Sequence, residues 1–75
     1  MYRLDAKKIV FRFGGRMELF RKLRAGGHDI SVKTIEKWME RRSIPSARLL
    51  VLMEMAKKEN RPLVLDDYVI EEQPL

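Results

Sequence analysis

Residues 30–45 read ISVKTIEKWMERRSIP, and this stretch decides how the rest of the chain is interpreted. On a helix with 100° per residue, its apolar and charged side chains separate onto opposite sides. The apolar side carries Ile35, Trp38 and Met39, and the charged side carries Lys33, Glu36, Lys37 and Glu40. Ser31 is a favourable N-cap, and Pro45 marks the start of the next helix. The pattern therefore predicts a helix over residues 32–42 that packs on one side and faces solvent on the other.

Two helices are predicted before this one, over residues 4–14 and 16–24. Asp5 is a suitable N-cap for the first, and Gly14 can adopt the left-handed conformation that ends a helix. The apolar face of the first helix consists of Ile9, Val10 and Phe13, and that of the second of Met17, Leu19, Phe20 and Leu23. A strand is the alternative for the first segment, because apolar residues also alternate along residues 9–13. Both end signals favour the helix.

The fourth predicted helix, over residues 45–59, is apolar on two sides. One stripe consists of Leu49, Leu52, Met53 and Ala56, and a second, nearly opposite, of Ala47, Val51 and Met55. A helix of this kind is usually covered on both sides, by its own domain or by a partner chain. Residues 62–75 form a C-terminal tail that is either a short helix or two extended pieces around Asp66-Asp67. We expect this tail to pack on the domain or on a dimer partner.

Charge is distributed unevenly along the 75 residues, whose formal net charge is +5. Residues 1–48 hold 13 Lys/Arg and 5 Asp/Glu, a balance of +8, whereas residues 49–75 hold 3 and 6, a balance of −3. A polyanion would be attracted to the first two-thirds of the chain and repelled by the remainder. Such asymmetry points to nucleic acid or to an anionic membrane surface as a partner.

The composition gives little support to catalysis or to a bound cofactor. There is no cysteine, and the only histidine, His28, lies in a glycine-rich turn, so neither a disulfide framework nor a zinc site is expected. The adjacent acidic pairs of the tail would not converge on one substrate. No stretch approaches the ~20 apolar residues of a membrane span, and the N-terminus lacks a signal-peptide pattern. We therefore expect a cytoplasmic protein that is not an enzyme and has no membrane association.

The charged side of the helix predicted over residues 32–42 has the chemistry of a DNA-reading surface. Lys33 and Lys37 can donate to guanine O6 and N7, and Glu36 can accept from the cytosine amino group. Arginines gather around this helix at positions suited to phosphate contacts, namely Arg16, Arg41, Arg42 and Arg48. The alternative is an ordinary solvated face with weak ion pairs three and four residues apart.

Several runs resemble the phage Cro-type and lambda-repressor-like helix-turn-helix domains. Phe13-Gly14-Gly15-Arg16 is similar to the opening of that domain, and the run from Ile30 to Trp38 is similar to its turn and recognition helix. Arg42-Ser43-Ile44-Pro45 resembles the exit loop, so the likeness covers roughly residues 6–60. It implies an all-α fold: a compact helix-turn-helix domain of four to five helices over residues 1–61, followed by the short tail.

The resemblance also implies residue roles. It assigns contacts with bases to Ser31, Val32, Lys33, Thr34, Glu36 and Lys37, and contacts with phosphate to Gly15 and Arg16, to which their position adds Arg41 and Arg42. The chain departs from the family in one respect. Leu23 and Ile35 stand twelve residues apart where roughly seven would be expected for a short turn, which makes residues 24–29 an extended turn.

The function expected from these observations is sequence-specific binding of double-stranded DNA by a repressor-type transcription regulator of phage or prophage origin. Because one recognition helix reads few base pairs, a homodimer is expected, formed through residues 45–59 or the tail. No cofactor and no metal are expected. The alternative is a protein-interaction module, or an antitoxin-like or excisionase-like protein, that uses the two-sided helix.

Overall fold

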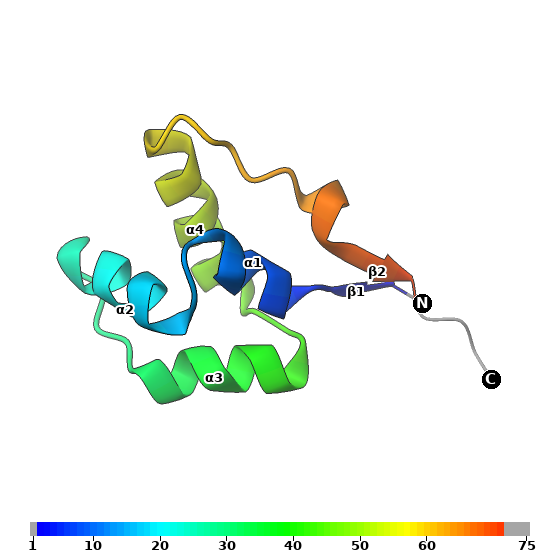
Figure 1. Cartoon of the computed structure of the whole chain (residues 1–75), viewed down its shortest axis with the longest axis horizontal. Helices are drawn as coiled ribbons and strands as arrows, with labels where there is room; N and C mark the ends of the chain where they lie inside the picture. Colours follow the sequence, from blue (N-terminus) through cyan, green and yellow to red (C-terminus); the bar gives the residue numbers. More distant parts are fainter. Residues whose placement is uncertain (1, 72–75) are drawn as a thin grey trace.

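The structure is a computed structural model that describes residues 2–71. The order of elements is given in Figure 1: β1 (Tyr2–Leu4), α1 (Ala6–Arg12), α2 (Arg16–Ala25), α3 (Val32–Arg41), α4 (Ser46–Lys58), a 3-10 helix η1 (Leu65–Tyr68) and β2 (Val69–Glu71). The described chain is thus mainly helical, as predicted, and all four helices lie within one or two residues of their expected bounds. The two strands are an addition that the sequence pattern did not predict.

Side-chain caps explain where two of the helices begin. The Asp5 carboxylate accepts a hydrogen bond from the backbone N–H of Lys8 at 3.1 Å, at the start of α1. The Ser31 hydroxyl accepts from the backbone N–H of Thr34 at 3.2 Å, at the start of α3. Both predicted N-caps are therefore confirmed, and the strand alternative for residues 9–13 is wrong.

Gly14 is required where the chain turns from α1 into α2. Its φ is +102°, and a Cβ at this position would lie 2.9 Å from the Glu18 Cγ. An L-residue would therefore meet both backbone strain and a steric clash. This turn directs α2 across α1 and fixes where the N-terminus of α2 emerges.

The core lies between the four helices. Its members are Ala6, Ile9, Val10, Phe13, Leu19, Leu23, Ile30, Ile35, Trp38, Ile44, Leu52, Ala56 and Leu63. The predicted buried face of α2 needs a correction, because Met17 is 48% exposed and Phe20 is only partly buried. Leu19 and Leu23, four residues apart, share the inner side of α2. Met17 precedes Leu19 by two residues, which turns it well away from that side.

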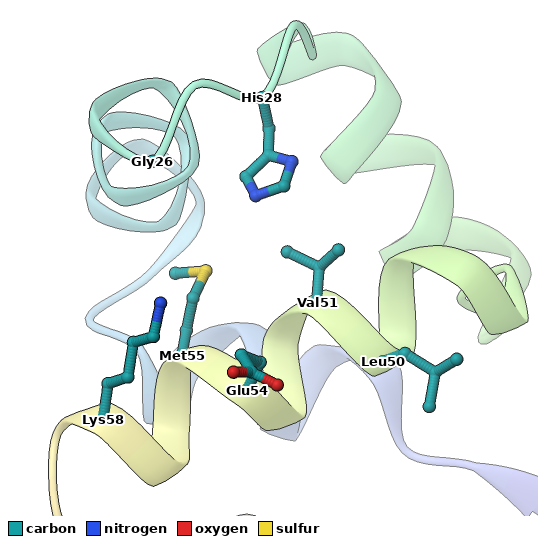
Figure 2. Close-up of a pocket in the computed structure, with 7 residues that line it drawn as sticks. All are labelled: Gly26, His28, Leu50, Val51, Glu54, Met55 and Lys58. Carbon is teal, nitrogen blue, oxygen red and sulfur yellow. The ribbon is translucent and has the colours of Figure 1, made fainter.

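Helix α4 is buried mainly along one of its two predicted stripes. Leu52 and Ala56 are fully buried, which confirms the inner stripe. The second stripe is covered in part by its own chain: Val51 and Met55 are half-buried beneath the turn that connects α2 to α3 (Figure 2), whereas Ala47 is exposed.

The segment after α4 returns to the beginning of the chain. Leu63 is buried, η1 lies against α1, and β2 pairs with β1 in an antiparallel register that joins Arg3 with Ile70. The backbone N–H of Asp5 donates to the Tyr68 carbonyl, which extends this connection. The tail therefore combines a short helix and an extended piece, the two conformations that its pattern left open. Residues 72–75 lie outside the described part of the chain.

A carboxylate at the end of α4 ties three helices together. Lys22 Nζ lies 2.8 Å from Glu59 Oε1, and Arg12 Nη1 lies 3.8 Å from Glu59 Oε2. The Arg12 guanidinium also donates to the backbone carbonyl of Arg61. The hydrogen bond from Lys22, together with the positive charges of Lys22, Arg12 and Arg61, lowers the pKa of the Glu59 carboxyl below its usual value of 4.5.

We expect the substitution Glu59→Gln to lower the free energy of unfolding at pH 7 by up to about 1 kcal/mol. The effect is small because the ion pairs of Glu59 with Lys22 and Arg12 are partly exposed and screened by solvent. A pKa that is lower in the folded protein means that the ionised carboxylate stabilises the fold. This stabilisation is fully present above the unfolded pKa of about 4.5 and is lost as the pH falls through the folded pKa. The difference between wild type and variant should therefore shrink in acid.

Urea unfolding at a series of pH values measures this difference. Glu40→Gln is the matched control, because Glu40 is exposed and within residues 2–71 has no ion pair. Equal free energies of unfolding for the two variants at pH 7 would contradict the role given to Glu59.

Candidate nucleic-acid interface

Helices α2 and α3 pack against each other and are joined by residues 26–31. Leu23 and Ile35 are both fully buried where the two helices meet. The chain leaves α2 through Gly27, whose φ is +85°, and the backbone N–H of His28 donates to the Leu23 carbonyl at 2.9 Å. The extended turn predicted for residues 24–29 therefore begins two residues later and runs to the N-cap of α3.

Helix α3 has one anchored side and one free side. Ile35 and Trp38 are buried on the anchored side, which rests on α1 and α2. Figure 1 shows α3 along the lower edge of the molecule, with the other helices on one side of it. Its exposed side chains are Lys33, Lys37, Glu40 and Arg41. The free side of α3 is thus charged and is held on a fixed support.

The six side chains predicted to contact bases are placed differently from one another. Ser31, Lys33 and Lys37 are exposed, whereas Val32, Thr34 and Glu36 are partly buried. The hydroxyls of Ser31 and Thr34 lie 3.0 Å apart and are hydrogen-bonded to each other, so both take part in the cap of α3. Within residues 2–71, Lys33 and Lys37 have no ion-pair partner and retain all their donor capacity.

Arg16 and Glu36 form an ion pair between the start of α2 and the middle of α3. The Arg16 Nε lies 3.5 Å from the Glu36 Oε1, and both side chains are about half exposed. The sequence pattern placed Arg16 on a phosphate and Glu36 on a base as separate contacts. In the structure Glu36 instead faces Arg16, which orients the guanidinium at the N-terminus of α2.

The remaining predicted phosphate contacts surround the two helices. Gly15 is the N-cap of α2, with φ of +99°, and its own N–H donates to the Val10 carbonyl at 3.1 Å. A phosphate at this end would therefore meet the amides that follow Gly15, not Gly15 itself. Arg41 is exposed in the last turn of α3, and Arg42 is its C-cap, in the left-handed conformation with φ of 52°.

A shallow hollow of about 290 Å³ runs beside the second half of α3. It is bordered by Thr34, Lys37, Trp38, Arg41, Ser43 and Pro45. Two cations and two hydroxyls that come from α3 and its exit loop thus meet at one surface. The sequence pattern assigns no role to Ser43. The i, i+4 spacing of Lys37 and Arg41 shows that the two cations share one side of α3. That Ser43 lies beside them follows only from the structure.

The two flanks of α3 differ in charge. On the flank opposite this hollow, a second one of about 310 Å³ is bordered by Arg16, Glu36, Met39 and Glu40. Its two carboxylates face a single guanidinium, whereas the flank with Lys37 and Arg41 has no carboxylate on its border. An anionic ligand is therefore favoured along the Lys37 flank over the hollow that Arg16 shares with Glu36 and Glu40.

Other kinds of site find no counterpart in residues 2–71. This part of the chain holds no group of three or more His, Cys, Asp or Glu side chains arranged to hold a metal ion. The imidazole of His28 is directed at α4, above Val51 and Met55 (Figure 2). No described helix combines the length and the apolar character needed to cross a bilayer.

Comparisons with known proteins were made with protein-family models, curated proteins and solved structures, and none of the three found a match for this chain.

Proposed function

We propose that the protein is a sequence-specific, double-stranded-DNA-binding regulator of transcription, of the repressor type and without catalytic activity, that inserts α3 into the major groove. The observation that carries this proposal is the row formed by Lys33, Lys37 and Arg41 on the free side of α3. The opposite side is held by the buried Ile35 and Trp38. A recognition helix needs this combination, because base contacts require a charged helix face in a fixed orientation.

The proposal divides the cations into two groups. Lys33 and Lys37 donate to base edges, whereas Arg16 and Arg41 contact phosphates and fix the register of the protein on the duplex. Glu36 holds Arg16 in the orientation of the observed ion pair and does not itself contact a base. The resemblance of residues 6–60 to Cro-type domains implies the same roles for Lys33, Lys37 and Arg16. The role of Arg41 is added from its position on α3, and the resemblance itself would place Glu36 on a base.

A homodimer belongs to this proposal, because one helix reads too few base pairs to distinguish an operator from a genome. Two copies of α3 would enter successive major grooves about one DNA turn apart. A pure protein-interaction module is the second candidate, favoured by Leu50, which is 66% exposed on α4. A protein-interaction module does not require the row of cations on α3. Binding to duplex DNA is therefore expected of the regulator and not of the interaction module.

The test is selection of preferred duplexes from a random pool, followed by titration of the selected and a random duplex. Lys37→Ala should weaken binding to the selected duplex by about 1–3 kcal/mol and reduce the preference over random DNA, because the alanine cannot donate to the base edge. Arg16→Ala should weaken both duplexes by a similar factor, because a phosphate contact carries no sequence information.

Arg61→Ala is the matched control, since it also removes one positive charge but lies beyond the C-terminal end of α4, away from α3. It should change neither affinity by more than about twofold. If Lys37→Ala and Arg16→Ala lower both affinities equally, α3 is not the reading helix. Absence of binding to any duplex would rule out the proposed function.

A further inference from the structure

Helix α4 carries a ridge of one apolar and one acidic side chain, both exposed in the described chain. Leu50 is 66% exposed, the largest exposed fraction among the large apolar side chains of residues 2–71, and Glu54 follows it one turn later. We call these two residues the α4 ridge. Both line two separate hollows, one on each side of α4. The ridge therefore stands between two depressions.

The two hollows have apolar floors that belong to different parts of the chain. The first, of about 420 Å³, is the His28 hollow, which lies between α4 and the α2–α3 turn (Figure 2). Its floor is formed by the half-buried Val51 and Met55. The second, of about 520 Å³, is the Pro62 hollow, bordered by Met53, Pro62 and Leu63. Burial of such surfaces from water is favourable, in proportion to the apolar area covered.

The charges on this face complement one another between two antiparallel copies. Glu54 lies on the ridge, and Lys57 and Lys58 follow it three and four residues later. Within residues 2–71, none of these three side chains is in an ion pair. When two such helices run antiparallel, the acidic position of each lies opposite the basic positions of the other. The pairing then occurs twice, once on each side of the two-fold axis.

We propose that a second copy of this chain docks on this face, with its α4 antiparallel to the first. In the register that places Glu54 opposite Lys57 and Lys58 of the second copy, Leu50 lies level with the C-terminal end of the second α4. There the Pro62 hollow receives it, so the ridge of each copy packs into a hollow of the other. The inference deepens the homodimer of the proposed function by naming its surface, and it does not depend on DNA.

This face leaves the candidate DNA-binding surface free. Figure 1 shows the C-terminal half of α4 on the opposite side of the molecule from α3. None of Lys33, Lys37 or Arg41 borders either hollow of the proposed contact. The proposed contact differs from the one expected from the sequence, which used the second apolar stripe of α4. Val51 and Met55 of that stripe line the floor of a hollow, and Leu50 projects toward the second copy instead.

Sedimentation velocity of the full chain without DNA tests the proposal, over concentrations from about 5 μM to about 500 μM. The wild type should shift from monomer to dimer. Leu50→Gln should raise the dimer dissociation constant on the order of 100-fold, because each dimer would bury two polar side chains in place of two leucines. Its thermal unfolding at the lowest concentration should match the wild type, since Leu50 is exposed in the monomer. Val64→Gln is the control, because Val64 is 53% exposed but borders neither hollow, and it should leave the dimer intact.

Charge reversal gives an independent test. Glu54→Lys should abolish the dimer, because it places like charges opposite each other. The combined variant Glu54→Lys/Lys57→Glu/Lys58→Glu should restore it with opposite polarity. A wild type that stays monomeric overturns the proposal. So does a dimer whose dissociation constant Leu50→Gln leaves unchanged, or a combined variant that is folded but monomeric. A protein that dimerises but binds no duplex would instead overturn only the proposed function.

Discussion

Raising monovalent salt from about 50 mM to about 200 mM is expected to weaken binding to duplex DNA by about three orders of magnitude. The expectation assumes that a dimer engages ~6 phosphates, which gives a slope of log affinity against log salt near −5 through counterion release. The cations available to neutralise these phosphates lie around α3, and residues 1–48 carry a balance of +8. Fluorescence anisotropy with a labelled random duplex measures the slope directly.

The slope also locates the cations that meet the DNA backbone. Replacing Arg16 or Arg41 by alanine should make the slope shallower by about one unit for each phosphate that is no longer neutralised, and twice that in a symmetric dimer. Replacing Arg61 by alanine should leave it unchanged. A flat response to salt would contradict the electrostatic basis of the proposed function, even if some binding remained.

Phe13→Ala should cost about 3–5 kcal/mol of the free energy of unfolding, a large share of the ~5–10 kcal/mol that a domain of this size possesses. Phe13 is 1% exposed and closes the core at the end of α1. The guanidinium of Arg12 lies 4.6 Å from its ring centroid, and the ammonium of Lys22 lies 5.8 Å from it. Its removal therefore leaves a cavity beneath the ion pairs of Glu59. The variant should be largely unfolded at 37 °C by circular dichroism.

Phe11 provides a control two residues away. It is 59% exposed, and Phe11→Ala should change the free energy of unfolding by no more than about 0.5 kcal/mol. The two substitutions remove the same atoms at the end of α1, so the burial of Phe13 and its contacts with Arg12 and Lys22 distinguish them. Similar losses of stability for both variants would mean that the core is assigned to the wrong side of α1.

Local signals are sufficient to predict the helices. The caps at Asp5 and Ser31 act within one turn, and the apolar spacing of Ile35 and Trp38 needs only the helical repeat. Such signals depend on neighbouring residues alone, and each of these helices therefore begins and ends close to its expected bounds. The inner stripe of α4 is predictable for the same reason.

Features that depend on distant residues are not predictable in this way. Strands of three residues carry too little periodicity to be recognised, and β1 and β2 lie at opposite ends of the described chain. The ion pair of Arg16 with Glu36 depends on how α2 crosses α3, which no spacing in the sequence specifies. The exposure of Leu50 likewise depends on which neighbours cover α4.

The pairing of β1 with β2 has a consequence for the order in which the protein is assembled during synthesis. Tyr2 is synthesised well before its register partner, Glu71. The segments that form α1, α2 and α3 are already available to pack when β2 is synthesised. The strand pair, in contrast, forms only when a loop that spans nearly the whole described chain closes. We therefore expect the helical core to form first and the strand pair last. In native-state hydrogen exchange, the amides of Arg3 and Ile70 should accordingly open before those of Ile35.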